Sequence, residues 1–466
     1  MLASLHMKIV HRNLSKMKIS KVSRAVFLFL FVLPVSNSTW AQEKSILTLD
    51  KAISIALEQN RDILIADQDR EKADAQIAEA RSGAFPQLSF SAQYMRNIKL
   101  PVIFLPGNSP PFNPSPNTIS FAIGSNNSYQ GGLSLTQAIY SHQVNVALAI
   151  ANTYKDLSDA GYESTKQNIV LQVKKAFYGV LLMQKLVEAN RQGFDVVKAN
   201  YENVQALYKH GQAAEFDLLR AEVQVSNTEP AVISAENNLL LAVNGLKILL
   251  SIPLDSDVVI RGDFTFTEVP ESNLDQGSRN GLTNNPALQQ LSFQETMLGQ
   301  NIGIEQSGFF PSVFAFGAYQ WQTQDNTFQL NNYLWANVAS IGLTLSWNIF
   351  DGFRTPARVE QAKVDLRKIQ YTRLKAEEGI SIQIQSARLD MDEAKRRIEG
   401  QEKNIEQAKK AVSIAETRFK SGVGTQLELL DTQVAMTLAE TNYAQAIYDY
   451  LVAYAEWEFA VGQGSK

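Results

Sequence analysis

A long helical pattern that occurs twice constrains the fold more than any other feature. From Ile380 to Phe419 the chain can be read in alternating steps of four and three residues, and eleven of the twelve positions carry apolar side chains. This period of 3.5 residues places them along one side of a helix, as in a supercoiled pair of helices. The pattern stops at Ser421-Gly422-Val423-Gly424-Thr425, and a second apolar helix pattern then includes Leu427, Leu430 and Val434. The sequence therefore predicts a long helical hairpin with a tight turn.

The same pattern lies 211 positions earlier, from Ile169 to Tyr208. Its single polar position, Asn190, corresponds to Gln401. The glycine that follows the end of the pattern, Gly211, corresponds to Gly422. A shared register, a shared exception and a shared turn predict an internal duplication, so the chain is one architecture made of two halves. We expect Asn190 and Gln401 to form a polar layer that sets the register of each helix pair.

The N-terminus has the composition of an export signal. Six basic residues and no acidic residue precede a short apolar run from Val26 to Leu33, and Thr39-Trp40-Ala41 is an acceptable cleavage site. About eight apolar residues are too few to cross a bilayer as a helix, so we expect a cleaved signal peptide at 1–41. No run after it approaches 20 apolar residues. A membrane-spanning part would have to consist of strands.

Charge and cysteine content exclude several classes of function. The chain after residue 41 has 37 Lys and Arg against 47 Asp and Glu, a net charge of about −10. Such a chain lacks the basic surface that nucleic-acid binding needs, so no nucleic-acid partner is expected. The absence of cysteine excludes disulfides, thiolate metal sites and a lipid on an N-terminal cysteine. With four histidines, no helically spaced metal-ligand pair and no phosphate-binding glycine loop, the sequence predicts neither an enzyme nor a cofactor.

Two related motifs mark a change from helix to strand. After Ser82-Gly83-Ala84-Phe85-Pro86 and after Ser307-Gly308-Phe309-Phe310-Pro311 the apolar period falls from 3.6 to 2. Each motif is followed by an alternating strand, a polar loop and a return strand, which predicts four strands of about ten residues. The first loop, at 99–127, holds six prolines and cannot be a helix.

The four strands fit a transmembrane barrel, and the alternative is a soluble sandwich. Four strands cannot close a barrel, and each unpaired edge group in lipid costs several kcal/mol, so the protein must form an oligomer. Two copies give eight strands and three give twelve; an eight-stranded barrel is filled by its own side chains, so a channel favours three. The aromatic residues that we expect at the membrane interfaces are Tyr94, Tyr129, Tyr140, Tyr319, Trp321, Trp335 and Trp347.

Three acidic residues lie in the first turns of the helices that follow the two tips. In a three-fold assembly Asp217, Glu428 and Asp431 would each form a ring of carboxylates, which selects for cations at a narrow mouth. The alternative is a structural role, because acids stabilise helix N-termini and Thr425-x-x-Glu428 fits a capping box. The first tip has Ala214 at the corresponding place, so Asp217 lacks that explanation.

The order and duplication of these elements resemble the TolC-like outer-membrane efflux proteins. The resemblance includes both tips and Asn348-Ile349-Phe350-Asp351-Gly352 at the switch from strand to helix. It implies a mainly α fold with a transmembrane β-barrel, in which three copies form a twelve-stranded barrel in the outer membrane and a twelve-helix periplasmic tunnel. It also implies a periplasmic adaptor and an inner-membrane transporter as partners.

The resemblance assigns roles to the tips. Asp217, Glu428 and Asp431 would form the constriction. Apart from the resemblance, Arg220 occupies the place in the first half that Asp431 holds in the second, so we expect a salt bridge between Arg220 and Asp431 of a neighbouring copy. The turns would dock the adaptor through Gly211, Gln212, Gly422, Val423, Gly424 and Thr425. One departure is that no basic residue stands next to Gly424, where a family member carries a basic residue that helps to lock its tip.

The expected segments follow from the patterns and the resemblance together. They are a signal peptide (1–41), N-terminal helices (42–85), a barrel hairpin (86–140) with an extracellular loop (99–127), a helical hairpin (141–250) with its tip at 209–215, an irregular equatorial region (251–285), a helix (286–310), a second barrel hairpin (311–350), a second helical hairpin (351–462) with its tip at 420–426, and a tail (463–466). Within them we expect a short strand at 258–266 and a kink or break at Pro230.

These patterns predict a passive export channel, and two other classes remain. A periplasmic coiled-coil adaptor or scaffold would purify without detergent, and a surface adhesin or rod would show no conductance. The alternating strands bounded by aromatic residues argue against both. The cargo and the class of pump are not encoded in these patterns.

Overall fold

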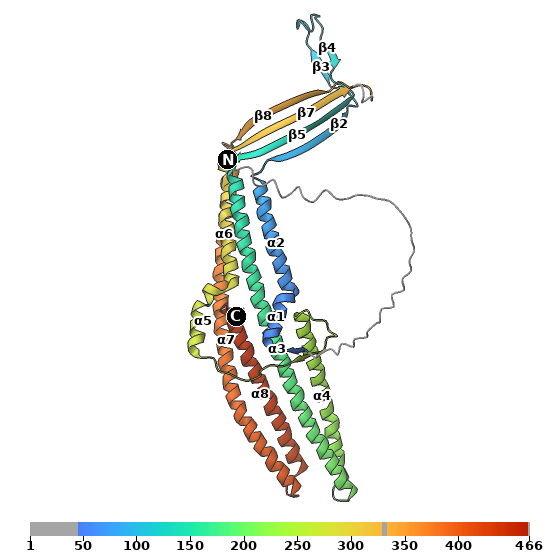
Figure 1. Cartoon of the computed structure of the whole chain (residues 1–466), viewed down its shortest axis with the longest axis vertical. Coiled ribbons are helices and arrows are strands. Elements are labelled where there is room, and N and C mark those ends of the chain that lie inside the picture. The colour runs from blue at the N-terminus through green and yellow to red at the C-terminus, as the bar shows by residue number, and fades with distance from the viewer. Residues whose placement is uncertain (1–44, 329–332, 465–466) are drawn as a thin grey trace, which may run out of the picture. The chain divides into compact units, whose positions relative to one another are not determined.

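The computed structural model describes residues 45–328 and 333–464 of a mainly helical chain (Figure 1). The predicted signal peptide lies outside the described residues. The helices are α1 Leu49–Gln59, α2 Arg61–Ser82, α3 His142–Lys209, α4 Glu215–Leu249, α5 Glu271–Asn284, α6 Pro286–Gln306, the 3-10 turn η1 Ser307–Phe309, α7 Arg354–Lys420 and α8 Gln426–Ala460. The strands are β1 Ser45–Leu47, β2 Gln87–Arg96, β3 Val102–Leu105, β4 Ile119–Ala122, β5 Asn127–Tyr140, β6 Val258–Ile260, β7 Ser312–Asp325 and β8 Ala336–Ser346.

The main elements form rows of four. The sheet has the order β2-β5-β7-β8 with antiparallel neighbours. One row of helices runs α2, α3, α6, α7 by contact, and a second runs α4, α3, α8, α7. The helices α3 and α7, of 68 and 67 residues, belong to both rows. Each row therefore starts with an element of the first half (β2, α2 or α4) and ends with β8 or α7.

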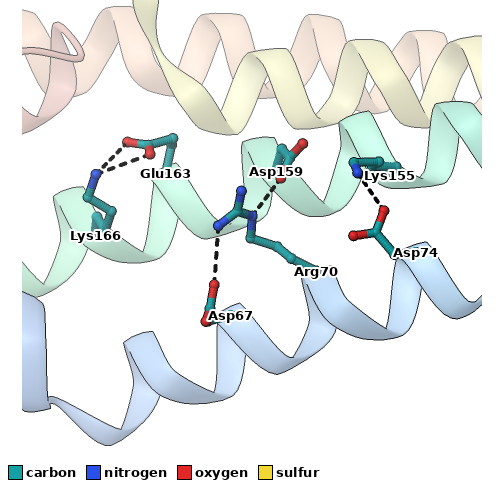
Figure 2. Close-up of polar contacts among 7 residues, drawn as sticks. All are labelled: Asp67, Arg70, Asp74, Lys155, Asp159, Glu163 and Lys166. Atoms are coloured by element: carbon teal, nitrogen blue, oxygen red, sulfur yellow. Dashed lines mark hydrogen bonds and ion pairs between the residues drawn. The ribbon is translucent and has the colours of Figure 1, made fainter. Parts of the chain in front are cut away.

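Ion pairs align α2 along α3. Arg70 Nε of α2 lies 2.6 Å from the Asp159 carboxylate of α3, and Lys155 of α3 pairs with Asp74 of α2 (Figure 2). These side chains are largely exposed, so each pair contributes at most about 1 kcal/mol. They mainly fix the register of the two helices, while Ile77 and other buried side chains of α2 provide the apolar contact.

Two apolar clusters hold the middle of the helices. The first joins α1, α3 and α4 around Phe177, Val173 and Leu250, which are almost fully buried. The second joins α7 and α8 around Ala394 and Trp457. Burial of a large apolar side chain stabilises a fold by about 1.5–3 kcal/mol, so these clusters outweigh the exposed ion pairs.

The segment between α4 and α5 connects the clusters. β6 pairs in parallel with β1 beside the first cluster, and Phe264 packs against both clusters. The Tyr450 hydroxyl of α8 accepts a hydrogen bond from the Val269 backbone N–H at 3.2 Å. The two halves are therefore tied together at mid-length by the chain that links them.

Several sequence expectations about secondary structure are wrong. The loop at 99–127 contains the β3–β4 hairpin, because its six prolines all lie outside the two short strands. The region at 251–285 contains α5, which has no apolar stripe and is instead placed by close contacts of Gly277 and Gly281 with α7 and α8. The strand predicted at 258–266 ends at Ile260.

Other corrections concern strand ends and helix faces. β8 ends before Trp347 and Ile349, and α4 continues through Pro230 because packing along α3 supports it on both sides. On α8 the buried residues after the tip are Leu429 and Leu430, whereas Leu427 and Val434 are exposed.

The two polar residues of the seams make their side-chain hydrogen bonds within their own helices. The Asn190 amide donates to the Leu186 carbonyl at 2.7 Å, and the Gln401 amide oxygen accepts from Asn404 at 3.1 Å. Both bonds lie within a single helix, so a polar layer that sets the register between helices stays a prediction.

The junction between β8 and α7 depends on Asp351. Gly352 and Phe353 have φ values of 70° and 63°, and Phe353 is a side-chain-bearing residue in the left-handed region. Asp351 compensates, because its carboxylate accepts hydrogen bonds from the Arg354 and Thr355 backbone N–H groups and from the Thr355 hydroxyl. The Thr355 hydroxyl and these N–H groups lower the pKa of Asp351.

We predict that Asp351→Asn lowers the thermal midpoint at pH 7 by removing this charged cap. A carboxylate with a lowered pKa stabilises the fold above its unfolded pKa of about 4 and loses that effect as pH falls through the folded pKa. The difference between the two chains should therefore shrink toward pH 3 in circular dichroism melts. Asp365→Asn, on the exposed side of α7, is the control and should change little; an Asp351→Asn deficit that persists at pH 3 would contradict the role.

A second prediction concerns α5. A Cβ at Gly277 would lie 2.5 Å from the buried Trp457 ring, whereas at Gly400 on α7 it would meet nothing within 4 Å. Gly277→Ala should therefore lower the thermal midpoint, as overpacking costs about 1–3 kcal/mol. Gly400→Ala should leave it unchanged or raise it, since Ala favours helix by up to about 1 kcal/mol. Equal midpoints for the two variants would refute the close approach of α5.

Candidate functional site

The four-stranded sheet has one apolar face and one polar face. The register places Phe90, Leu133, Tyr319 and Ala339 side by side across β2, β5, β7 and β8. The apolar and glycine residues of this face are Leu88, Phe90, Ala92, Tyr94, Tyr129, Gly131, Leu133, Leu135, Tyr140, Val313, Ala315, Gly317, Tyr319, Trp321, Ala339, Ile341, Leu343 and Leu345. Its polar residues are Arg96, Asn127, Gln137, Thr323, Asp325 and Asn337. The alternate residues are mostly Ser, Thr and Gln.

Both faces of the sheet are largely exposed, and the exposure of the apolar face is the unusual feature. Ile341 is 90% exposed, Leu343 73% and Phe90 63%, and no described helix covers them. Soluble monomers rarely expose so large a contiguous apolar surface. Alternation of apolar and polar faces over four strands, with the apolar face uncovered, is the pattern of a sheet in contact with lipid.

Five of the seven predicted interface aromatics lie on the apolar face, and two flank it. Tyr94 and Tyr129 lie 4.8 Å apart between ring centroids near the loop end of the sheet, with Trp321 and Tyr319 close by. Tyr140 lies near the helix end of β5. Trp335 directly precedes β8, and Trp347 directly follows it.

The sequence reasoning missed a further set of aromatic residues at the helix end of the sheet. The Trp347 indole N–H donates to the Phe309 carbonyl at 3.1 Å. The missed residues, all between 46% and 75% exposed, are Phe85, Phe309, Phe310, Phe350 and Phe353. Their signal was present, because they belong to the two repeated motifs and to the segment after β8. They give this end of the sheet the aromatic border that membrane interfaces favour.

The two helical tips close in the same way. At the first, Gly211 has φ 71°, its N–H donates to Tyr208 O, and the Gln212 N–H donates to Leu207 O at 2.8 Å. At the second, Gly422 has φ 74° with the matching bonds to Phe419 O and Arg418 O. This is the helix ending in which a left-handed glycine satisfies the last carbonyls.

The second tip is more tightly held than the first. The Gly424 N–H also donates to Arg418 O at 2.9 Å, and a Cβ at Gly424 would lie 2.9 Å from the Arg418 Cβ. The Thr425 hydroxyl accepts from the Glu428 N–H at 3.2 Å, whereas Ala214 provides no side-chain cap for α4. Val423 at the end of the turn is 70% exposed.

The tip charges are only partly paired within one chain. Glu428 does not complete the capping box and instead lies 3.5 Å from the Arg418 guanidinium. Arg418 corrects the expectation that no basic residue stands near Gly424, because the turn brings the two together in space. Asp217 and Arg220 are half-buried and Asp431 is exposed, and within residues 45–328 and 333–464 their side chains make no hydrogen bond or ion pair.

No helix in the part of the chain that the structure describes is long and apolar enough to span a membrane. No group of three or more His, Cys, Asp or Glu side chains there is arranged to hold a metal ion.

The chain is similar in sequence to two known bacterial proteins and in fold to a third. The outer membrane protein TolC of Vibrio cholerae is 22% identical over 438 residues, 93% of each chain. The alkaline protease secretion protein AprF of Pseudomonas aeruginosa is 22% identical over 339 residues, 72% of this chain and 70% of AprF. The CmeC outer membrane channel of Campylobacter jejuni matches the fold with a TM-score of 0.73 at 17% identity, over 96% of this chain and 94% of CmeC.

The family profile agrees with these relatives and with the resemblance seen in the sequence. It is described as outer membrane efflux protein and matches residues 52–251 and 278–463. Those segments contain all of α3, α4, α6, α7 and α8 and the whole four-stranded sheet. The chain belongs to the outer membrane efflux protein family.

Proposed function

We propose that this protein is a passive export channel, three copies of which form a barrel in the outer membrane and a helical tunnel in the periplasm. The observation that supports it most is the exposed apolar face of a four-stranded sheet whose other face is polar. In a closed barrel the apolar face contacts lipid and the polar face lines a water-filled pore. Relatives are named as an outer membrane channel and a secretion protein, which fits efflux or one-step secretion.

The free edges of the sheet require other copies. β2 and β8 each pair on one side only, so their remaining N–H and C=O groups would be unsatisfied in lipid. Pairing β2 of one copy with β8 of the next satisfies both edges. Three copies give twelve strands, enough for a pore wider than an eight-stranded barrel filled by its own side chains.

The helices carry a matching pair of unpartnered stripes. On α4, Phe216, Leu219, Val223, Ile233 and Leu240 are between 52% and 70% exposed. On α7, Ile382, Leu389 and Ile414 are between 61% and 66% exposed. We assign α4 of one copy to α7 of the next, which closes four helices per copy into a twelve-helix tunnel and buries both stripes.

The tips form the gate and the docking surface in this proposal. In the closed tunnel Asp217 and Asp431, unpaired within one chain, form carboxylate rings that favour cations, and Glu428 adds to them. Arg220 pairs with Asp431 of the next copy. The turn residues Gly211, Gln212, Gly422, Val423, Gly424 and Thr425 dock the adaptor, and an inner-membrane transporter supplies the energy.

The proposed location is the outer membrane, with the helical tunnel in the periplasm. A cleaved signal at 1–41 exports the chain, and the lack of cysteine rules out a lipid on an N-terminal cysteine. A soluble adaptor or scaffold is disfavoured, because the exposed apolar face of the sheet would be in contact with water.

The gate leads to a direct prediction. Asp217→Ala combined with Asp431→Ala should raise single-channel conductance and weaken cation preference in planar bilayers, because the carboxylate rings and the Arg220 contact are lost. Glu229→Ala, which removes an exposed carboxylate of α4 outside the tip, is the control and should change neither. Unchanged currents in the double variant would remove these two residues from the gate.

A further inference from the structure

The polar face of the sheet carries no charged side chain in the strands that the structure describes. Its residues are Gln87, Ser89, Ser91, Gln93, Met95, Ser128, Gln130, Gly132, Ser134, Thr136, Ala138, Ser312, Phe314, Phe316, Ala318, Gln320, Gln322, Gln324, Ala336, Val338, Ser340, Gly342, Thr344 and Ser346. Such a wall neither attracts nor repels ions of either sign. Any preference for cargo in this part of the pore must come from uncharged groups.

Two phenylalanines stand out on this face. Phe314 and Phe316 lie two residues apart on the central strand β7, and they are the only aromatic residues among the polar-face positions of the four described strands. Phe316 is 38% exposed, and Phe314 is half-buried. Both therefore present apolar surface to the side that the proposed channel fills with water.

The neighbouring strand makes room for one of the rings. Gly342 of β8 lies opposite Phe316, and a Cβ there would lie 2.8 Å from the Phe316 ring. Phe314 lies opposite Thr344, and Ala315 between the two rings points to the apolar face. The Phe316 ring thus occupies the space over a glycine, and Thr136 of β5 lies opposite it on the other side.

Packing on Gly342 accounts for one side of the Phe316 ring and not for the exposed remainder of the two side chains. Neither Phe314 nor Phe316 belongs to an apolar cluster of the described chain, and neither ring stacks on another aromatic ring there. A buried ring normally gains stability by leaving water, yet the Phe316 ring stays partly in it. A patch of this kind, surrounded by polar groups, marks a contact site.

We propose that Phe314 and Phe316 are a contact site for cargo in the pore, and that its preferred occupant is an organic cation with an aromatic body. The inference rests on the proposed channel function, in which three copies place six such rings around the lumen. Aromatic faces attract cations, and the uncharged wall offers no competing anion or cation site. The carboxylates proposed at the tips select the same sign of charge at the entrance.

The strength of such a contact suits a conduit. Each exposed ring contributes roughly a two- to five-fold gain in affinity for a cation, a contact weak enough to allow release. Small inorganic ions, which are strongly hydrated, gain little from it. The site therefore favours cations that carry an aromatic ring over small inorganic cations of the same charge.

Blocking of single-channel currents tests the site. Benzyltrimethylammonium and tetramethylammonium carry the same charge, and only the first has an aromatic ring. Added to the loop side of the full-length channel in planar bilayers, benzyltrimethylammonium should produce blocks at least about three-fold longer than those of tetramethylammonium. Benzoate, with the same ring and a negative charge, should block more weakly than benzyltrimethylammonium.

Variants connect the block to the two rings. Phe314→Ser with Phe316→Ser should remove the difference between the two cations, and Phe314→Leu with Phe316→Leu, which preserves apolar volume and protects folding, should do the same. Gln320→Ser, on the same face of the same strand, and Phe90→Leu, a ring lost from the apolar face, should retain the difference.

The outcomes separate this inference from the channel itself. A chain that conducts no current would refute the proposed function. A conducting channel that is blocked equally by the two ammonium ions, or in which the Leu double variant still distinguishes them, would overturn the contact site. Equal block by benzoate would overturn the preference for cations.

Discussion

The main sheet and both helical rows each consist of four elements with two free edges, and the rest of the structure follows from that constraint. In the sheet the edges are β2 and β8, and in the helical rows they are α2 or α4 and α7. A free strand edge in lipid leaves backbone groups without hydrogen bonds, and a free helix stripe exposes apolar side chains to water. One chain cannot satisfy either group by itself, whereas copies joined edge to edge satisfy both.

The two long helices, α3 and α7, connect the free edges at one end of the molecule to those at the other. α3 and α7 belong to both helical rows, so the strand pairs at one end and the tips at the other are carried by the same rods. The link through β6 and Phe264 ties the two apolar clusters at mid-length. The two tips differ in their side-chain contacts. The tip between α7 and α8 has the Arg418–Glu428 ion pair, whereas the tip between α3 and α4 has no side-chain cap at the start of α4.

Periodicity was sufficient to predict the long elements from the sequence. The four main strands and the four helices of the two hairpins lie where alternation and the 3.5-residue seam place them, because each buries or exposes one continuous face. α4 and α8 begin and end 211 positions apart, at Glu215–Leu249 and Gln426–Ala460. The aromatic residues Tyr94 to Trp321 on the apolar face follow from the same alternation.

Features without a period were missed, each for a physical reason. α5 has no apolar stripe and depends on glycine contacts with Trp457, which lies 180 positions later. The β3–β4 hairpin was hidden by the prolines at its ends. Arg418 reaches Glu428 only because the tip folds back on itself, and Asn190 and Gln401 bond within their own helices, which spacing alone cannot reveal. Single-residue contacts of this kind depend on the tertiary fold and not on local pattern.

The mass of the particle extracted from outer membranes in detergent tests the central claim most directly. The mature chain should appear in native mass spectrometry as a complex of three copies, since closure of both free edges requires neighbours. A particle of one chain, soluble without detergent, would contradict it.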